Sequence, residues 1–441
     1  MTLLGQSRRR TELGLIVLGI IVIGCLYTLA SLGRTASVPA NIGPFLGVLA
    51  ALFIGAHLAV RRLAPNADGM LLPLAALLNG VGYVFIARLN SGLADNQAIW
   101  TGVGILAFVL TLAFVRRVRD LERYRYTFLF IGLVLLVLPL APGVGRSVNG
   151  SRIWVAFGPF SFQPGEFAKI AFALFFASYL VERREVLGMA TWPKFRPMLP
   201  DLKHLGPVLL AWGMAILVMV AEKDLGSSLL FFGLFMAMLW VATGRLAYVV
   251  GGAGLFGVTA YGAWTAFDHV QARVTNWINP WNDPAQGGYQ VIQAWFALAW
   301  GGVAGTGIAL GRPDRIPEVA NDFIFAAIAE ELGLLGATAV LVAYLLIIGA
   351  GLRIATQAEN QFEKLLATGL TALIGLQTFV IIAGVIRVLP LTGVVLPFIS
   401  YGGSALVANY VLLALLLRIS DTTETSAAKK SRRAAATVGA R

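Results

Sequence analysis

The residues best suited to chemistry lie in a polar stretch from residue 268 to residue 322, inside an otherwise apolar chain. The ionisable side chains of this stretch include His269, Arg273, Asp283, Glu318 and Asp322. A connection between two helices of a membrane bundle needs only a few residues, so a polar loop of this length predicts a working surface and not a hinge.

Asp283 is the predicted catalytic residue of this loop. Pro280 and Pro284 stiffen the segment, and Gly287-Gly288 allow a sharp turn after it. Aromatic and apolar surroundings favour the protonated form of a carboxylate, which suits a general base that accepts a proton from a sugar hydroxyl. An ordinary turn is the plainer interpretation of Asp-Pro, but nearby arginines such as Arg273 indicate an anionic phosphate ligand.

A second polar cluster spans residues 149–169. Glu166 and Lys169 are three residues apart, so on a helix that begins near Pro164 they share one face and can form an ion pair. Charges at membrane depth are costly unless they are paired or hydrated. The pair is therefore either a structural salt bridge or a direct substrate contact, and the sequence leaves both open.

Three more clusters interrupt the apolar segments. Asp224 follows a charged hairpin tip, predicted to be solvated, and begins a helix where a carboxylate can cap amides or point into the bundle. Glu330 and Glu331 lie within an apolar segment and must face protein or water. The region 387–410 contains prolines and a Gly-Gly pair that break helices and free backbone groups to line a cavity.

The elements that position these residues are transmembrane helices. With 58% hydrophobic and 13% charged residues and a mean hydropathy of +0.78, the chain is a polytopic membrane protein. A span needs roughly 20 apolar residues. Twelve are predicted, at 12–31, 41–60, 70–88, 97–115, 126–142, 164–182, 205–221, 225–242, 246–267, 323–351, 363–387 and 398–417. The apolar run 290–300 is too short to span and is predicted to be interfacial or re-entrant.

Basic residues predict the orientation. With the N-terminus inside, the inner segments hold 24 of the 34 Lys and Arg residues, so both termini are predicted to be cytoplasmic and the 268–322 loop extracellular. The net charge of +12 then reflects topology and anionic lipid, not nucleic acid. No phosphate-binding P-loop, zinc-type cluster or G-x-S-x-G elbow is present in the sequence, which argues against ATP hydrolysis and metalloprotease chemistry.

Five motifs of the chain carry a resemblance to a known family: GSRIW, FQPGEFAKI, INPWNDPAQGGYQ, IPEVANDFIFAAIAEELG and LPLTGVVLPFISYGGS. Through them the chain resembles the SEDS family, the RodA and FtsW proteins of bacterial cell-wall elongation and division. The resemblance covers roughly residues 70–418, and PLTG at Thr392 resembles the RodA branch. It implies an all-α polytopic membrane fold and a peptidoglycan glycosyltransferase that polymerises lipid II on the outer face of the bacterial cytoplasmic membrane during elongation.

The same resemblance assigns the site. Asp283 matches the family's catalytic aspartate. The predicted substrate-binding residues are Arg152, Trp154, Gln163, Glu166, Lys169, Asp224, Arg273, Gln290, Glu318, Asp322, Thr392 and Ser400. The implied partners are lipid II, membrane lipid and a class B penicillin-binding protein, with no nucleic acid. No cofactor is required; a divalent cation, Mg²⁺ or Mn²⁺, is compatible with phosphate binding but has no dedicated site.

The chain departs from the family pattern in several places. Gln286 replaces a glycine, Gly165 replaces a serine, and Arg387 stands where a glycine is common. Residues 1–66 are predicted to be an added two-helix segment, in which His57 is too isolated to form a site, followed by a core at 67–418 and a disordered basic tail at 419–441. Two other functions stay open: a lipid II flippase or transporter, and a non-catalytic scaffold for a penicillin-binding protein.

Overall fold

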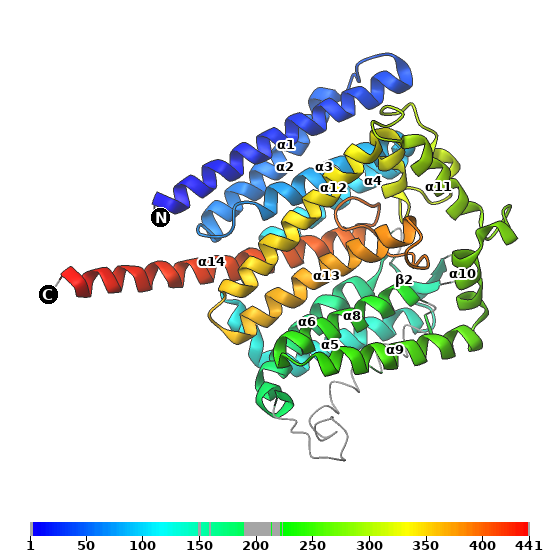
Figure 1. Cartoon of the computed structure of the whole chain (residues 1–441). Helices are drawn as coiled ribbons and strands as arrows, with labels where there is room; N and C mark the ends of the chain where they lie inside the picture. Colours follow the sequence, from blue (N-terminus) through cyan, green and yellow to red (C-terminus); the bar gives the residue numbers. More distant parts are fainter. Residues whose placement is uncertain are drawn as a thin grey trace.

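The computed structural model describes residues 3–148, 151–157, 160–188, 213, 221–222 and 224–439, and these form a bundle of long helices. The first six long helices are α1 (Leu3–Thr35), α2 (Ile42–Leu63), α3 (Leu71–Leu89), α4 (Ser91–Phe114), α5 (Arg125–Val137) and α6 (Pro164–Gly188). The later ones are α8 (Leu225–Thr243), α9 (Leu246–Ala266), α12 (Ile324–Gln357), α13 (Gln361–Val385) and α14 (Gly403–Gly439). The start of α1 and the end of α14 lie at one end of the bundle (Figure 1).

Shorter elements gather mainly at the opposite end. They are α10 (Asp268–Ile278) and α11 (Tyr289–Gly301), the 3-10 helices η1 (Val118–Tyr124), η2 (Leu138–Leu140), η3 (Pro280–Asn282) and η4 (Pro313–Arg315), and three strands, β1 (Gly145–Val148), β2 (Ser151–Phe157) and β3 (Phe160–Phe162). In Figure 1, α10 and α11 lie at the end of the bundle away from the chain termini. The long loop between α9 and α12 is thus partly helical.

Eleven helices among the described residues are long and apolar enough to cross a membrane, and they match eleven of the predicted spans. The remaining predicted span, 205–221, lies almost wholly outside the described residues, so the count of twelve stays a prediction. The chain is a predominantly helical, multi-pass membrane protein.

Burial separates central helices from peripheral ones. In the most apolar 18-residue stretch of each helix, 94% of the residues are buried in α14 but only 6% in α9. α14 packs against α4, and α13 packs against α12, α8 and α6. Small residues permit such close packing: a Cβ on Gly82 of α3 would come within 2.3 Å of the carbonyl oxygen of Ile399. The central helices α6, α13 and α14 therefore form a rigid scaffold.

A small antiparallel sheet precedes α6 and was not predicted. β2 is the central strand, with Gly145 of β1 opposite Val155 and Phe162 of β3 also opposite Val155. β-branched and aromatic residues such as Ile153, Trp154 and Val155 suit a pleated, half-buried surface, and this local preference is the sequence signal for the strand. The sheet carries Arg152 and Trp154 toward the end of the bundle that holds α10.

The helix α12 is broken at Gly333, whose φ is +66°. The segment after α11 pairs with the break: Thr306 N donates to the Glu330 carbonyl at 2.9 Å, and Leu334 N donates to the Gly302 carbonyl at 3.0 Å. A Cβ on Gly333 would lie 2.3 Å from Gly305 N, so this close approach requires glycine. The break is thereby satisfied by protein, as backbone groups at membrane depth must be.

Both carboxylates beside this break are buried and hold the glycine-rich segment 305–312. Arg312 N donates to Glu330 Oε1 at 2.7 Å, and Ala309 N donates to Glu331 Oε2 at 2.8 Å. Arg88 of α3 pairs with Glu331, with Nε and Oε1 2.6 Å apart. The prediction that Glu330 and Glu331 face protein or water is confirmed, and both face protein.

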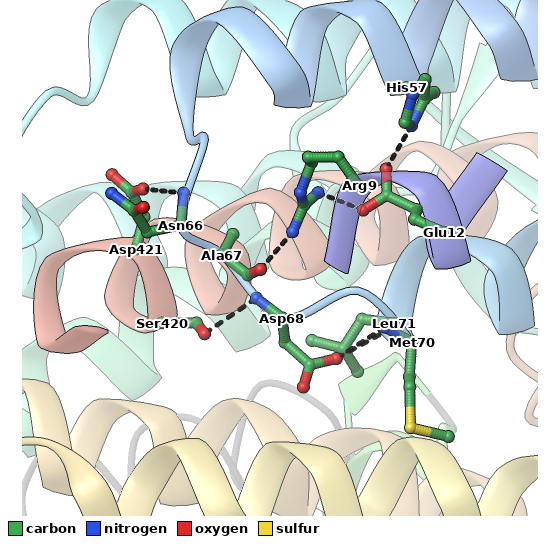
Figure 2. Close-up of polar contacts among 10 residues, drawn as sticks. All are labelled: Arg9, Glu12, His57, Asn66, Ala67, Asp68, Met70, Leu71, Ser420 and Asp421. Atoms are coloured by element: carbon green, nitrogen blue, oxygen red, sulfur yellow. Dashed lines mark hydrogen bonds and ion pairs between the residues drawn. The ribbon is translucent and has the colours of Figure 1, made fainter. Parts of the chain in front are cut away.

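A polar network at the opposite end joins α1 and α2 to the core (Figure 2). Glu12 accepts a hydrogen bond from Arg9 and lies 2.7 Å from His57 Nδ1, and Arg9 also donates to the Ala67 carbonyl. Arg9, Glu12 and His57 are all buried. The prediction that His57 is isolated was wrong, because α1 and α2 pack antiparallel and bring sequence-distant residues together.

Residues 419–439 continue α14 as a helix and correct the prediction of a disordered tail. The start of this extension is tied to the α2–α3 linker: Asn66 N donates to Asp421 Oδ1 at 2.8 Å, and Asp68 N donates to Ser420 Oγ at 3.0 Å (Figure 2). Ser420 and Thr423 are buried. Composition predicted solvation, but these contacts arise from the distant 64–70 linker.

Candidate active site

A cavity of about 560 Å³ lies at the end of the bundle that holds α10 and α11. Most of the predicted substrate-binding residues line it, namely Trp154, Gln163, Asp224, Arg273, Gln290, Glu318, Asp322 and Thr392. They come from the sheet, the start of α8, α10, α11 and the segments before α12 and α14. The fold thus brings together side chains that are more than 200 residues apart in sequence.

A larger cavity, of about 1040 Å³, lies at the other end and is lined by η1 arginines and by Glu182, Glu359 and Glu363. It contains none of the predicted site residues. The smaller cavity is therefore the candidate active site, because its lining combines aromatic surface with carboxylates, amides and an arginine.

Asp283 lies at the rim of the cavity. Its Oδ2 accepts a hydrogen bond of 3.0 Å from the backbone N of Gly287, and Gly287 lines the cavity. Asp283 itself is exposed, so the apolar surroundings predicted for it are absent in this structure. The carboxylate faces solvent on a turn that touches the cavity wall.

The turn that carries Asp283 is tightly closed. Gly288 N donates to the Asp283 carbonyl at 2.8 Å, and a Cβ on Gly288 would lie 1.8 Å from the Pro280 carbonyl oxygen. Only glycine fits there without movement of the backbone. The sharp turn predicted at Gly287-Gly288 is confirmed, and it fixes Asp283 immediately before α11.

Arg273 crosses the cavity from α10 to the segment before α14. Its Nη1 donates to the carbonyls of Thr392 at 3.1 Å and Leu391 at 3.4 Å. The side chain is half-buried and lines the cavity, so its remaining donors are available to an anion. The prediction that Arg273 and Thr392 belong to one site agrees with this geometry.

Asp322 is the cavity carboxylate with the strongest perturbation. The pKa of Asp322 is raised to about 6, chiefly by burial and also by the nearby Glu318, whereas Arg273 acts in the opposite direction. Glu318 is exposed, has a φ of +53°, and its Oε2 accepts a hydrogen bond of 2.7 Å from Asn321 Nδ2. Asp322 therefore changes charge close to physiological pH, as acid–base groups of active sites do.

Gln290 and Asp224 line the cavity, and the side chain of each also forms a hydrogen bond with a backbone group. Gln290 Nε2 donates to the Pro317 carbonyl at 2.7 Å, and Asp224 Oδ1 accepts from Ser227 N at 3.1 Å as the N-cap of α8. The N-cap role predicted for Asp224 is confirmed. Gln163 is anchored through its backbone N, which donates to Ser404 Oγ at 2.9 Å.

Four of the predicted substrate-binding residues do not line the cavity. Glu166 and Lys169 are buried and paired with each other, with 2.8 Å between Oε2 and Nζ. Arg152 Nη2 donates to the Ala141 carbonyl at 3.2 Å. Ser400 is buried and its Oγ accepts from Leu396 N at 2.9 Å. The predicted pairing of Glu166 with Lys169 is confirmed, whereas the choice between a structural salt bridge and a substrate contact stays a prediction.

Three residues of this region were not predicted to belong to the site. Trp277 and Arg387 line the cavity, and Arg387 is the one charged residue between positions 384 and 400, which is a signal that sequence reading could have used. Glu222 was assigned to a solvated hairpin tip but is buried, and burial together with Asp224 raises the pKa of Glu222 to about 8.

Within the part of the chain that the structure describes, no group of three His, Cys, Asp or Glu side chains is placed to hold a metal ion.

Comparison with known proteins agrees with this arrangement. A family model described as "Cell cycle protein" and named for FtsW, RodA and SpoVE matches residues 71–425. The chain is 42% identical over 427 residues to the peptidoglycan glycosyltransferase RodA of Mycobacterium tuberculosis (strain ATCC 25618 / H37Rv), covering 94% of this chain and 91% of the relative. That alignment extends ahead of residue 71 and so includes part of the α1–α2 segment.

Two further similarities are more distant. The chain is 32% identical to stage V sporulation protein E of Bacillus subtilis (strain 168), covering 80% of this chain and 96% of that protein. Its fold also matches a chain of a solved peptidoglycan synthase complex that coordinates polymerization and crosslinking, with a TM-score of 0.69, 26% identity, and coverage of 81% and 98% of the two chains.

Proposed function

The chain belongs to the FtsW, RodA and SpoVE family of cell cycle proteins, and from that premise we propose that it is a peptidoglycan glycosyltransferase of cell elongation. The substrate is lipid II, which the enzyme polymerises into glycan strands on the outer face of the bacterial cytoplasmic membrane. The observation that carries this proposal is the cavity beside Asp283, in which Arg273, Asp322, Gln290 and Trp154 converge from four separate parts of the chain.

The proposed chemistry joins two lipid-linked disaccharides. Asp283 takes the proton from the C4 hydroxyl of the acceptor's N-acetylglucosamine as that oxygen attacks the anomeric carbon of the donor. A new glycosidic bond forms, the bond from the anomeric carbon to pyrophosphate breaks, and undecaprenyl pyrophosphate leaves with the electron pair. Exposure of Asp283 at the rim suits this role, because the acceptor hydroxyl arrives from outside the cavity.

Arg273 is the proposed ligand of the pyrophosphate. Its guanidinium is already held by the Leu391 and Thr392 carbonyls, so it offers a fixed positive charge to the leaving group. Arg152 and Lys169, which were also predicted to bind substrate, are engaged elsewhere. We propose that no tightly held cofactor is needed, so a chelator of Mg²⁺ and Mn²⁺ should slow polymerisation by less than about tenfold.

Membrane orientation and partners complete the proposal. Both termini are assigned to the cytoplasm by the distribution of Lys and Arg, which puts the cavity on the outer face. The synthase complex of similar fold supports a class B penicillin-binding protein as the crosslinking partner.

The direct test uses purified full-length protein in detergent with fluorescently labelled lipid II. The expected product is glycan strands of many disaccharides. The strands are separated on a gel, and their digestion by a muramidase identifies them. A protein that moves lipid II across vesicles but forms no strands is a transporter. One that does neither yet stimulates a penicillin-binding protein is a scaffold.

A further inference from the structure

Arg387 sits where three elements around the cavity meet. It follows α13, faces the C-terminal end of α10, and lies against α11. Its planar guanidinium covers the ring of Trp295 on α11, with 4.6 Å from Cζ to the ring centroid. The two helices that it contacts are those immediately before and after the turn that carries Asp283.

The backbone at Arg387 is unusual for an arginine. Its φ is +63°, a left-handed conformation that favours glycine. Arg387 N donates to the Gly384 carbonyl at 3.2 Å, and Val388 N donates to the Ala383 carbonyl at 2.7 Å. This pair of hydrogen bonds is a Schellman motif, whose left-handed position is usually glycine. An arginine here is strained, so its side chain must make contacts that offset the strain.

Those contacts cap the end of α10. Arg387 Nε donates to the Trp277 carbonyl at 2.6 Å, and Nη2 donates to the Ile278 carbonyl. In return, Trp277 Nε1 donates to the Arg387 carbonyl at 3.1 Å. The last carbonyls of a helix lack partners within the helix, and a cation there is favoured by the helix dipole. The forked guanidinium satisfies two of these carbonyls together.

We propose that Arg387 is a positioning residue that holds the Asp283 turn at the rim of the cavity. Residues 279–288 connect α10 to α11, and Arg387 contacts the helix on each side of this connection, at Ile278 of α10 and at Trp295 within α11. Within the connection, Asp283 is tied to Gly287 and Gly288. If the end of α10 loosened, the whole turn would therefore move as a unit and carry the Asp283 carboxylate with it. The inference rests on the proposed function of Asp283 as general base.

The test compares Arg387→Gly with Arg387→Lys in the purified full-length protein. Glycine accepts the left-handed backbone without strain, so this variant should fold. Lysine keeps the positive charge but has no planar fork to reach two carbonyls. The matched control is Arg123→Ala, because Arg123 also lies 4.6 Å over a ring, that of Tyr124, in the connection before α5. Hydrogen exchange of residues 279–288 and steady-state polymerisation kinetics are measured for each.

In Arg387→Gly, the backbone amides of residues 279–288 should exchange hydrogen at least about tenfold faster than in the wild-type protein. The substitution should lower kcat by about 10- to 100-fold with little change in KM, since misplacement by about 1 Å can cost that much. Arg387→Lys should restore little of kcat, and Arg123→Ala should match wild type. In the Asp283→Asn background, Arg387→Gly should cause no further loss, because both act on one step.

The inference would be overturned if residues 279–288 of Arg387→Gly exchanged hydrogen at the wild-type rate. It would also be overturned if they exchanged faster while kcat stayed at the wild-type value. A rise in KM that lysine restores would also overturn it, since Arg387 would then be a substrate contact. Failure of the proposed function looks different: Asp283→Asn would polymerise normally, while the exchange rates would still report whether Arg387 holds the turn.

Discussion

Arg273 and Asp322 place opposite charges inside the cavity that we propose receives pyrophosphate. Arg273 is fixed by two carbonyls, whereas Asp322 is held near its ionisation point by burial. A carboxylate that is neutral part of the time opposes an anionic substrate less than a permanently charged one. The local balance of charge thus depends on pH near neutrality.

The raised pKa of Asp322, about 6, predicts how stability depends on pH. Between the ordinary value of 3.8 and about 6 the folded protein binds more protons at this site than the unfolded chain, so the contribution of Asp322 to stability falls as pH rises through that window. Asp322→Asn removes the charge and should raise the melting temperature at pH 7.5 but not at pH 4. Differential scanning fluorimetry in detergent measures both, and an equal shift at the two pH values would contradict the assignment.

Variants of Glu166 and Lys169 test whether each side chain acts only through its ion pair with the other. Removal of one member of a buried pair typically costs about 3–5 kcal/mol, so Glu166→Gln and Lys169→Met should each lower the melting temperature and the polymerisation rate. The exchanged pair, Glu166→Lys with Lys169→Glu, should recover much of both losses, because the coupling lies between the two side chains. A stably folded exchanged variant without activity would instead indicate direct substrate contact.

Sequence reasoning succeeded where the signal is local. Asp224 as an N-cap, Glu166 with Lys169 on one helical face, and the turn at Gly287-Gly288 all involve hydrogen bonds or ion pairs between residues at most five apart. It failed where partners are distant. The Arg152 contact with Ala141 depends on how the sheet folds back, and His57 meets Glu12 only because two helices pack together.

Among the larger elements, a buried ion pair joins α3 to broken α12 beside the segment that follows α11. Arg88 of α3 neutralises Glu331, and Arg88 Nη2 also donates to the Gly311 carbonyl at 2.8 Å. Three parts of the chain are therefore tied at one point beside the loop that follows α11. The sequence predicted buried carboxylates in this helix, but it did not identify Arg88 as their partner, since 243 residues separate Arg88 from Glu331.

Arg88→Met should destabilise the protein by about 3–5 kcal/mol, because it leaves Glu331 buried without its cation. The double change Arg88→Met with Glu331→Met should recover most of that loss. The control is Arg8→Met, which breaks the exposed pair with Glu424, whose atoms are 2.9 Å apart, and should cost less than about 1 kcal/mol. Thermal unfolding of the three variants in one detergent provides the comparison, and equal losses for Arg88→Met and Arg8→Met would refute the role of the buried pair.

Across the whole molecule, α1 and α2 flank the core and touch it at both ends. α1 packs on α3, α2 packs on α4, and a Cβ on Gly33 would lie 2.5 Å from the Ile308 carbonyl oxygen. Neither helix contributes a lining residue to the candidate active site. The eleven observed spans were predictable from hydropathy alone, whereas these contacts between α1, α2 and the core were not.

A truncated protein that starts near Ala67 should still polymerise lipid II, because the whole cavity is retained. It should melt at a lower temperature, since removal of Arg9, Glu12 and the apolar faces of α1 and α2 exposes part of α3 and α4. Initial rates and melting temperature are compared with the full-length protein. Loss of polymerisation in a folded, correctly oriented truncation would show that α1 and α2 belong to the catalytic unit.

The central claim is that Asp283 acts as the general base of glycan polymerisation at this cavity. Asp283→Asn keeps the size of the side chain and an oxygen that can accept from Gly287 N, but it removes the basic carboxylate. The measurement is the initial rate of strand formation from labelled lipid II by the purified variant, with the melting temperature as the folding control. The account predicts a loss of about 10²- to 10⁴-fold with an unchanged melting temperature. Strand formation at the wild-type rate would contradict it.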